Sequence, residues 1–142
     1  MVSEPLVKNA YVFAGQGRGT IRPGLYGLVQ DSPAGLDQIK IGSEVTGIDM
    51  EELCKSKDQS LLSANAQVLS VTMNMACLAK FQEQEAILKP DIVAGHSIGK
   101  LSALVVAGVL SYKHALLIAK KREELTKQIP QEKRGTMIAI AL

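Results

Sequence analysis

Residues 95–99 have the sequence GHSIG, and this segment of the chain has the clearest capacity for chemistry. The apolar run at residues 90–95 is typical of a short strand, and residues 98–107 have the composition of a helix. A serine between two glycines at a strand–turn–helix junction lies on a sharp turn, with its hydroxyl exposed beside the N–H groups of the helix N-terminus. The pattern therefore favours Ser97 as a nucleophile over the alternative of a plain structural turn.

The neighbours of Ser97 support the turn but do not supply a base. Gly95 and Gly99 let the strand and the helix approach closely. A serine hydroxyl attacks poorly unless a base takes its proton. The side chain of His96 should diverge from that of Ser97, so we assign His96 to support of the elbow. His114 lies in a charged part of its helix and is interpreted as a surface residue. The chain thus offers no convincing general base.

A glycine-rich loop is the second candidate site. The apolar run at residues 10–14, a predicted strand, is followed by GQGRG at residues 15–19. A dinucleotide-binding role is disfavoured, because residues 21–24 (IRPG) cannot open the required phosphate-binding helix. Two interpretations remain open: a turn that needs flexible backbone, or a loop whose N–H groups approach a reacting oxygen.

Arg122 is the third candidate. In the helix predicted from Ser111 to about residue 128, Arg122 shares the helical spacing of an apolar stripe. The other members of that stripe are Ala115, Ile118, Leu125 and Ile129. An inward guanidinium near a nucleophile would bind a substrate carboxylate with two hydrogen bonds. The alternative is that Arg122 extends to solvent or pairs with a nearby carboxylate.

The remaining pattern predicts an α/β fold. A long, mostly buried helix is expected at residues 61–84, short helices near Leu36 and Glu51, and a third strand at residues 136–142. Strands that alternate with helices indicate a layered domain with a parallel sheet. Because a core strand ends the chain, we expect residues 1–142 to be an incomplete domain, either truncated or one piece of a split protein.

Composition excludes several classes of function. A net charge of +2 and few aromatic residues argue against nucleic-acid binding. No signal peptide or membrane-spanning run is visible, so the sequence predicts a soluble, cytoplasmic protein without membrane partners. Cys54 and Cys77 lack metal-ligand spacing, and we expect two reduced thiols in separate helices, with Cys77 in the core and no metal site.

These features together resemble the malonyl-CoA:acyl-carrier-protein transacylase family and the acyltransferase domains of polyketide synthases. The resemblance follows the family's N-terminal half along nearly the whole chain. It rests on VFAGQG at residues 12–17, GHSIG at 95–99, LSALVVAGVLS at 101–111, REEL at 122–125 and GTM at 135–137.

The resemblance implies a role for each matching residue. Ser97 would carry the acyl group as an ester, and the backbone N–H groups of Gln16 and Ile98 would form the oxyanion hole. Arg122 would bind the free carboxylate of malonyl. The donor substrate would be malonyl-CoA, and the acceptor the phosphopantetheine thiol of an acyl carrier protein, in fatty acid or polyketide biosynthesis. No bound cofactor is implied.

Three departures from the family pattern stand out. The family's catalytic histidine would lie beyond Leu142, and one source of it would be a second chain that carries the C-terminal half. The family usually has glutamate after the elbow glycine, where this chain has Lys100, a cation that opposes the helix dipole and calls for a carboxylate partner or a functional reason. The stretch at residues 18–24 is shorter than usual.

The sequence thus predicts the nucleophile-bearing N-terminal portion of an acyltransferase, with a strand–serine elbow–helix in a patatin- or hydrolase-like core. This portion alone would be inactive. One alternative is a patatin-like serine lipase, although no Asp-Gly-Gly motif is present and Arg122 would not serve a neutral lipid. The other is a non-catalytic fragment or docking subunit.

Overall fold

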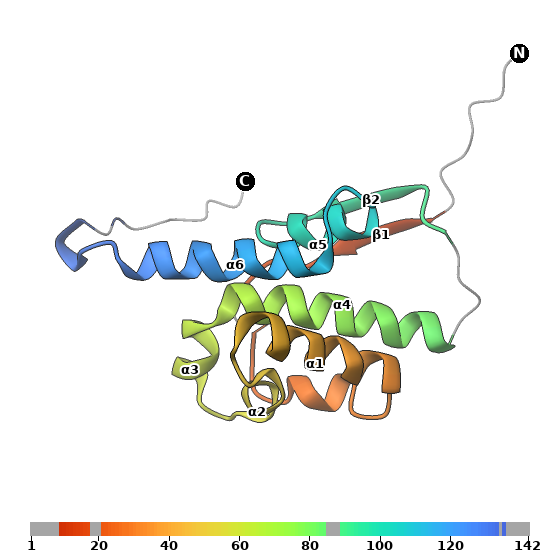
Figure 1. The fold of residues 1–142 in the computed structure, drawn as a ribbon, viewed down its shortest axis with the longest axis horizontal. Coiled ribbons are helices and arrows are strands. Elements are labelled where there is room, and N and C mark those ends of the chain that lie inside the picture. The colour runs from red at the N-terminus through yellow and green to blue at the C-terminus, as the bar shows by residue number, and fades with distance from the viewer. Residues whose placement is uncertain (1–8, 18–20, 85–88, 134, 136–142) are drawn as a thin grey trace, which may run out of the picture.

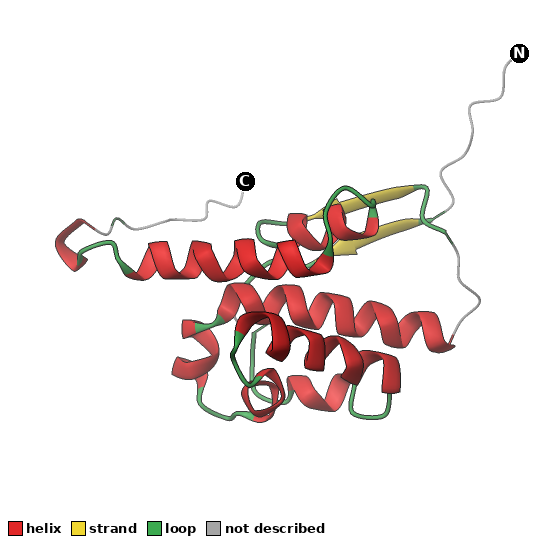
Figure 2. Cartoon of the chain, in the orientation of Figure 1, coloured by secondary structure: helices red, strands yellow, loops and turns green. Residues whose placement is uncertain are grey.

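The computed structural model describes residues 9–17, 21–84, 89–133 and 135. Helices predominate over a pair of short strands (Figures 1 and 2). The elements, in chain order, are β1 (Ala10–Phe13), the 3-10 helix η1 (Leu25–Leu28), α1 (Pro33–Thr46), α2 (Met50–Lys55), α3 (Gln59–Ala64), α4 (Ala66–Gln84), β2 (Ile92–Gly95), α5 (Gly99–Val106), α6 (Tyr112–Lys127) and the 3-10 helix η2 (Gln131–Lys133).

Helix α4 lies at the centre of the molecule. It contacts α1 on one side and α5 and α6 on the other (Figure 1). Every residue from 67 to 73 is buried, so the predicted burial of this helix is confirmed for its first half. A helix buried on all sides fits a sequence that is apolar around most of its circumference.

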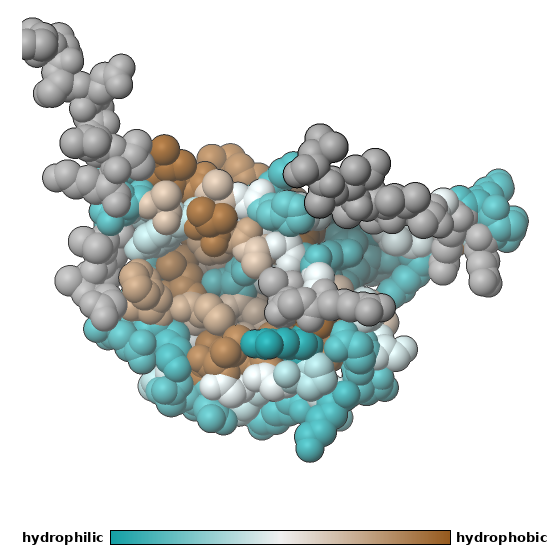
Figure 3. Space-filling model, turned by 180° about the vertical axis from the view of Figure 1, so that it is seen from behind, coloured by the Kyte–Doolittle hydropathy of each residue, from teal (hydrophilic) through white to brown (hydrophobic). Residues whose placement is uncertain are grey.

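The two strands confirm the predicted parallel pairing. β1 and β2 run side by side with Ala10 opposite Ile92 and Phe13 opposite Gly95. The interpretation of β1 as a buried strand was wrong for the described residues, because Val12 is 75% exposed. Alternate residues point to opposite faces, and the face that carries Val12 has no described element packed on it. Apolar residues gather in this part of the molecule in Figure 3, beside the grey N-terminal trace.

Local capping signals explain where the helices begin. The predicted N-cap Ser111 accepts a hydrogen bond from the His114 N–H, and Ser32 caps α1 in the same way through the Gly35 N–H. Gly108 follows α5 with φ 73°, as the sequence predicts. The strand predicted at residues 136–142 lies outside the described residues.

Two predictions about the helical layer need correction. The single helix expected at residues 61–84 is two helices, interrupted at Asn65, whose side-chain amide donates to the Leu61 carbonyl. The short helix expected near Leu36 is the 14-residue α1, which packs along α4.

No helix of the part that the structure describes is long and apolar enough to cross a bilayer.

The prediction that Cys77 lies in the core was wrong. Cys54 is the buried thiol, and Cys77 is exposed beside a groove between β1 and α4. Burial raises the pKa of Cys54 to about 12, and its Sγ lies 3.6 Å from the Met73 Sδ. Cys54 is therefore a protonated core residue at neutral pH. The two thiols do lie in separate helices, α2 and α4, as predicted.

Glu123 is a buried carboxylate that joins α6 to the start of α4. Only 7% of its surface is exposed, and its Oε1 accepts a hydrogen bond of 2.5 Å from the Gln67 N–H. Burial raises the pKa of Glu123, and the backbone N–H groups of Gln67 and Val68 and the charge of Lys127 oppose this rise. Glu123 thus satisfies helix N–H groups that α4 cannot satisfy itself.

Replacement of Glu123 tests this cap. Because the folded-state pKa of Glu123 is raised, the folded protein binds protons more tightly than the unfolded chain, and stability falls as pH rises from about 4 through the raised pKa. Glu123→Gln keeps an acceptor without the charge, so its unfolding free energy should increase relative to wild type between pH 4 and 7 in urea titrations.

Glu123→Ala serves as the comparison, because it leaves the helix N–H groups without an acceptor. It should be less stable than Glu123→Gln by about 1–2 kcal/mol at all pH values, because neither variant titrates at this position. If the unfolding free energy of wild type instead increases relative to that of Glu123→Gln as pH rises, the pKa of Glu123 is lowered rather than raised.

Candidate functional site

Ser97 lies on a strained turn between β2 and α5. Its φ is 52°, and it is the only non-glycine residue with positive φ among those the structure describes. The turn is closed by hydrogen bonds from the Gly99 N–H to the His96 carbonyl and from the Lys100 N–H to the Ser97 carbonyl. The His96 N–H is bonded to the Phe13 carbonyl, which ties the turn to β1. A left-handed serine at such a junction is the geometry of a nucleophile elbow.

The elbow depends on two glycines that allow backbone to touch backbone. A Cβ on Gly95 would lie 2.3 Å from the carbonyl group of Gly99. A Cβ on Gly99 would lie 2.4 Å from the Phe13 carbonyl oxygen and 2.6 Å from that of Ala14. No side chain fits at either position, so the sequence-based explanation of these glycines agrees with the geometry.

The glycine loop after β1 lies against the elbow, although the two segments are some 80 residues apart. A Cβ on Gly15 would lie 3.0 Å from both the Ser97 Cβ and the His96 Nδ1. Parallel pairing of Phe13 with Gly95 explains this contact, since both strands end at the same edge. The structure therefore brings two of the predicted site segments together, and the His96 ring packs on the loop.

Two backbone N–H groups at this junction have no acceptor among the residues that the structure describes. Neither the Gln16 N–H nor the Ile98 N–H makes a hydrogen bond to a described residue. The Ile98 side chain is buried in the core and anchors the start of α5. Free N–H groups beside a serine hydroxyl can stabilise a negative charge that develops on an oxygen there.

The histidines do not serve Ser97 as bases in this structure. His114 is exposed, and its Nδ1 lies 3.0 Å from the Ser111 Oγ. His96 lies beside Gly15, and the Ser97 hydroxyl has no hydrogen bond to a described residue. These are the only two histidines in the sequence. No group of three His, Cys, Asp or Glu side chains in the described ranges could hold a metal ion.

The prediction that Arg122 lies on the buried stripe of α6 was wrong for the described residues. The buried face is formed by Ala115, Leu116, Ala119 and Glu123, and Arg122 is exposed. Arg122 shares its face with Ile118 and Leu125, which are 40% and 51% exposed. Helix α6 carries two apolar stripes, and α4 and α1 cover the other one. The Arg122 guanidinium makes no ion pair with a described residue.

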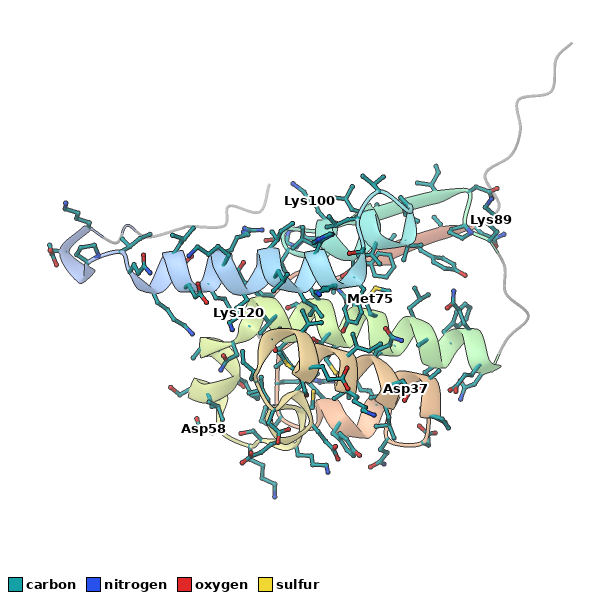
Figure 4. All side chains as sticks on the ribbon, viewed as in Figure 1. Asp37, Asp58, Met75, Lys89, Lys100 and Lys120 are labelled. Carbon is teal, nitrogen blue, oxygen red and sulfur yellow. The ribbon has the colours of Figure 1, made fainter. Side chains whose placement is uncertain are left out.

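Lys100 also has no carboxylate partner among the described side chains. It is exposed in the first turn of α5 and points away from α4 (Figure 4). A cation at this place is repelled by the helix dipole, so the structure offers no internal compensation for it.

Sequence reasoning missed Asn74 and Ser102. The Asn74 Nδ2 donates to the Ala14 carbonyl at 2.9 Å and lies 3.2 Å from the Ser102 Oγ. An amide between Met73 and Met75, in the middle of a mostly buried helix, was the signal that could have revealed this contact.

The strain at Ser97 can be measured. Glycine adopts positive φ without the cost that other residues incur, about 1–2 kcal/mol, so Ser97→Gly should be at least as stable as Ser97→Ala. The matched control is Ser63 in α3, which is exposed, where glycine should be less stable than alanine by about 1 kcal/mol. Thermal or urea unfolding gives the comparison. The quantity to compare is the stability of the glycine variant relative to the alanine variant at each position. If glycine is as unfavourable at position 97 as it is at position 63, the turn is unstrained.

Comparison of the sequence and the fold with known proteins identifies the family of this chain. The acyl transferase domain model matches residues 10–142. The malonyl CoA-acyl carrier protein transacylase of Bacillus subtilis is 37% identical over an alignment of 141 residues, which covers 94% of this chain and 42% of that protein. The acyl-carrier-protein S-malonyltransferase of Burkholderia pseudomallei superposes with a TM-score of 0.77 at 29% identity, over 85% of this chain and 39% of that one.

A further solved structure is a complex of a type II polyketide synthase acyl carrier protein with its malonyl transacylase. It has a TM-score of 0.74 at 30% identity and covers 85% of this chain and 40% of that one. The chain spans about two fifths of the length of these relatives. Its α/β fold is similar to theirs over the shared part, and the chain belongs to the acyl transferase domain family.

Proposed function

We propose that this chain carries the nucleophile and the oxyanion donors of a malonyl-CoA:acyl-carrier-protein transacylase. The observation that supports this most is the contact of the Gly15–Gln16 loop with the strained Ser97, in a chain whose relatives bear that name. We also propose that these residues are a portion of the catalytic domain, with a hydrolase-like core around the strand–elbow–helix unit.

The reaction would occur in two acyl transfers. The Ser97 Oγ attacks the thioester carbonyl of malonyl-CoA, the coenzyme A thiolate leaves, and malonyl stays on Ser97 as an ester. The phosphopantetheine thiol of a carrier protein then attacks the ester and releases Ser97. In both steps the carbonyl oxygen becomes negative, and the free N–H groups of Gln16 and Ile98 are available to stabilise it.

The proton of Ser97 needs an acceptor that we place outside these 142 residues. Both histidines of the sequence have other surroundings, His114 bonded to Ser111 and His96 packed on the loop. We propose a histidine in the part of the protein that corresponds to the remaining length of the relatives, on the same or a second polypeptide.

Arg122 is the proposed site for the malonyl carboxylate. Its guanidinium has no ion pair among the described residues, and its exposed neighbours Ile118 and Leu125 are apolar. If these apolar groups are covered in the active protein, the charge of Arg122 is buried with them and requires a carboxylate partner. A planar carboxylate can accept two hydrogen bonds from the guanidinium.

The carrier-protein partner follows from the same proposal. The transacylase that was solved with an acyl carrier protein has a similar fold over the part it shares with this chain. We propose an acyl carrier protein as the acceptor here, in fatty acid or polyketide biosynthesis.

The nucleophile is tested by mass spectrometry. After incubation of the native protein that carries this chain with malonyl-CoA, the peptide that contains Ser97 should be heavier by one malonyl group. Ser97→Ala should abolish the modification. Alanine differs from serine only by the hydroxyl, so the variant should keep the turn. The control is a measurement that Ser97→Ala is folded. Malonyl retained on another residue of the Ala variant would reject Ser97 as the acyl carrier.

Substrate selectivity tests Arg122. Arg122→Ala should lower kcat/KM for malonyl-CoA by about 100-fold or more, because the carboxylate loses a charged, paired donor, whereas acetyl transfer should change little. Arg122→Lys should recover only part of the loss, since an ammonium cannot form the paired contact. Lys121→Ala, one position earlier on α6, is the matched control. Equal losses for acetyl and malonyl would assign Arg122 a structural role.

A further inference from the structure

Asn74 connects three elements that meet behind the site. It lies in the middle of α4, its Nδ2 donates to the Ala14 carbonyl at 2.9 Å, and the same nitrogen lies 3.2 Å from the Ser102 Oγ. A backbone carbonyl only accepts hydrogen bonds, so the amide nitrogen must face Ala14. An amide nitrogen carries two hydrogens, and both partners can be bonded at once.

Both partners of Asn74 lie directly beside the elbow. The Ala14 carbonyl oxygen packs against Gly99, where an added Cβ would approach it to 2.6 Å. Ser102 is fully buried on α5, three residues after Gly99. The Asn74 amide therefore holds the Ala14 carbonyl between α4 and α5.

The Ala14 carbonyl begins the loop that carries the Gln16 N–H. Gly15, which follows, has the weakest backbone preferences of any residue and contacts His96 and Ser97. A loop built on glycine needs an external anchor to give its N–H groups one direction. The bond from Asn74 is such an anchor, and it comes from α4, in which every residue from 67 to 73 is buried.

We propose that Asn74 is a positioning residue for the oxyanion site. Through the Ala14 carbonyl it sets the direction of the Gln16 N–H relative to the Ile98 N–H, so that both can donate to one oxygen. This inference rests on the proposed function of Gln16 and Ile98. Asn74 does not contact the substrate.

A positioning role predicts a specific kinetic signature. Removal of a whole oxyanion donor lowers kcat by about 10²–10³, so misdirection of one donor should lower it by about 10-fold or more. The affected interaction is made only in the transition state, so kcat and kcat/KM should fall together while KM stays within about twofold.

The test uses Asn74→Leu and Asn74→Asp in the native protein that carries this chain. Asn74→Asp keeps the size and shape of the side chain, Asn74→Leu keeps its branching at Cγ, and both remove the donors. The control is Lys80→Met on the same helix, which removes the Lys80 Nζ bonds to the Leu28 carbonyl and the Asp31 carboxylate, far along α4 from the loop. The measurements are the single-turnover rate of Ser97 acylation by malonyl-CoA, KM and the thermal unfolding midpoint.

The expected result is acylation about 10-fold or more slower in both Asn74 variants, with KM little changed and Lys80→Met near wild type despite a comparable loss of stability. Folded Asn74 variants that acylate at the wild-type rate would overturn the proposal. Acylation rates that fall in proportion to the thermal unfolding midpoint in all three variants would also overturn the proposal. If Asn74→Leu does not fold, the isosteric Asn74→Asp decides.

A second reagent separates this proposal from the proposed function. A fluorophosphonate reacts with an activated serine through the same oxyanion site but needs no malonyl recognition. Wild-type protein that reacts with the fluorophosphonate at Ser97 but not with malonyl-CoA would reject the malonyl assignment alone. Asn74 variants should then still react about 10-fold more slowly with the fluorophosphonate, and equal rates would reject the positioning role alone.

Discussion

The close contact of backbone at the ends of the two strands is the constraint on which the site depends. Gly99 lies against the Phe13 and Ala14 carbonyls, and Gly95 lies against Gly99, at distances where no Cβ fits. This contact places the serine turn beside the glycine loop and forces Ser97 into a left-handed conformation. The Gln16 and Ile98 N–H groups, which have no hydrogen-bond acceptor among the described residues, belong to these two segments. In the proposed function they stabilise the oxyanion.

Helix α4 connects the loop and the serine turn to the rest of the molecule through its contacts. At its start, the Glu123 carboxylate of α6 accepts from its free N–H groups, and in its middle Asn74 holds the loop after β1. Burial on both sides keeps the helix in one place, since close-packed interiors do not adjust freely to displacement. A single buried helix thereby couples α1, α5 and α6 to the position of the loop.

Local signals allowed part of this structure to be predicted. The elbow, the loop, the N-cap at Ser111 and the end of α5 at Gly108 depend on neighbouring residues, and the structure has them where the sequence indicates. The face of α6 could not be predicted in the same way, because the helix has two apolar stripes and periodicity does not tell which one packs on α4. Arg122 was therefore assigned to the buried stripe and Glu123 was overlooked. Asn74 was missed because its partner Ala14 is 60 residues away.

A crystal structure of the native protein trapped as the malonyl ester of Ser97 tests the central claim most directly. The claim is that the loop and the elbow direct two N–H groups at one oxygen. The ester carbonyl oxygen should lie about 2.7–3.1 Å from the backbone nitrogens of both Gln16 and Ile98. An ester carbonyl that points to solvent, or that reaches Ile98 while the Gln16 N–H is bonded elsewhere, would contradict the account.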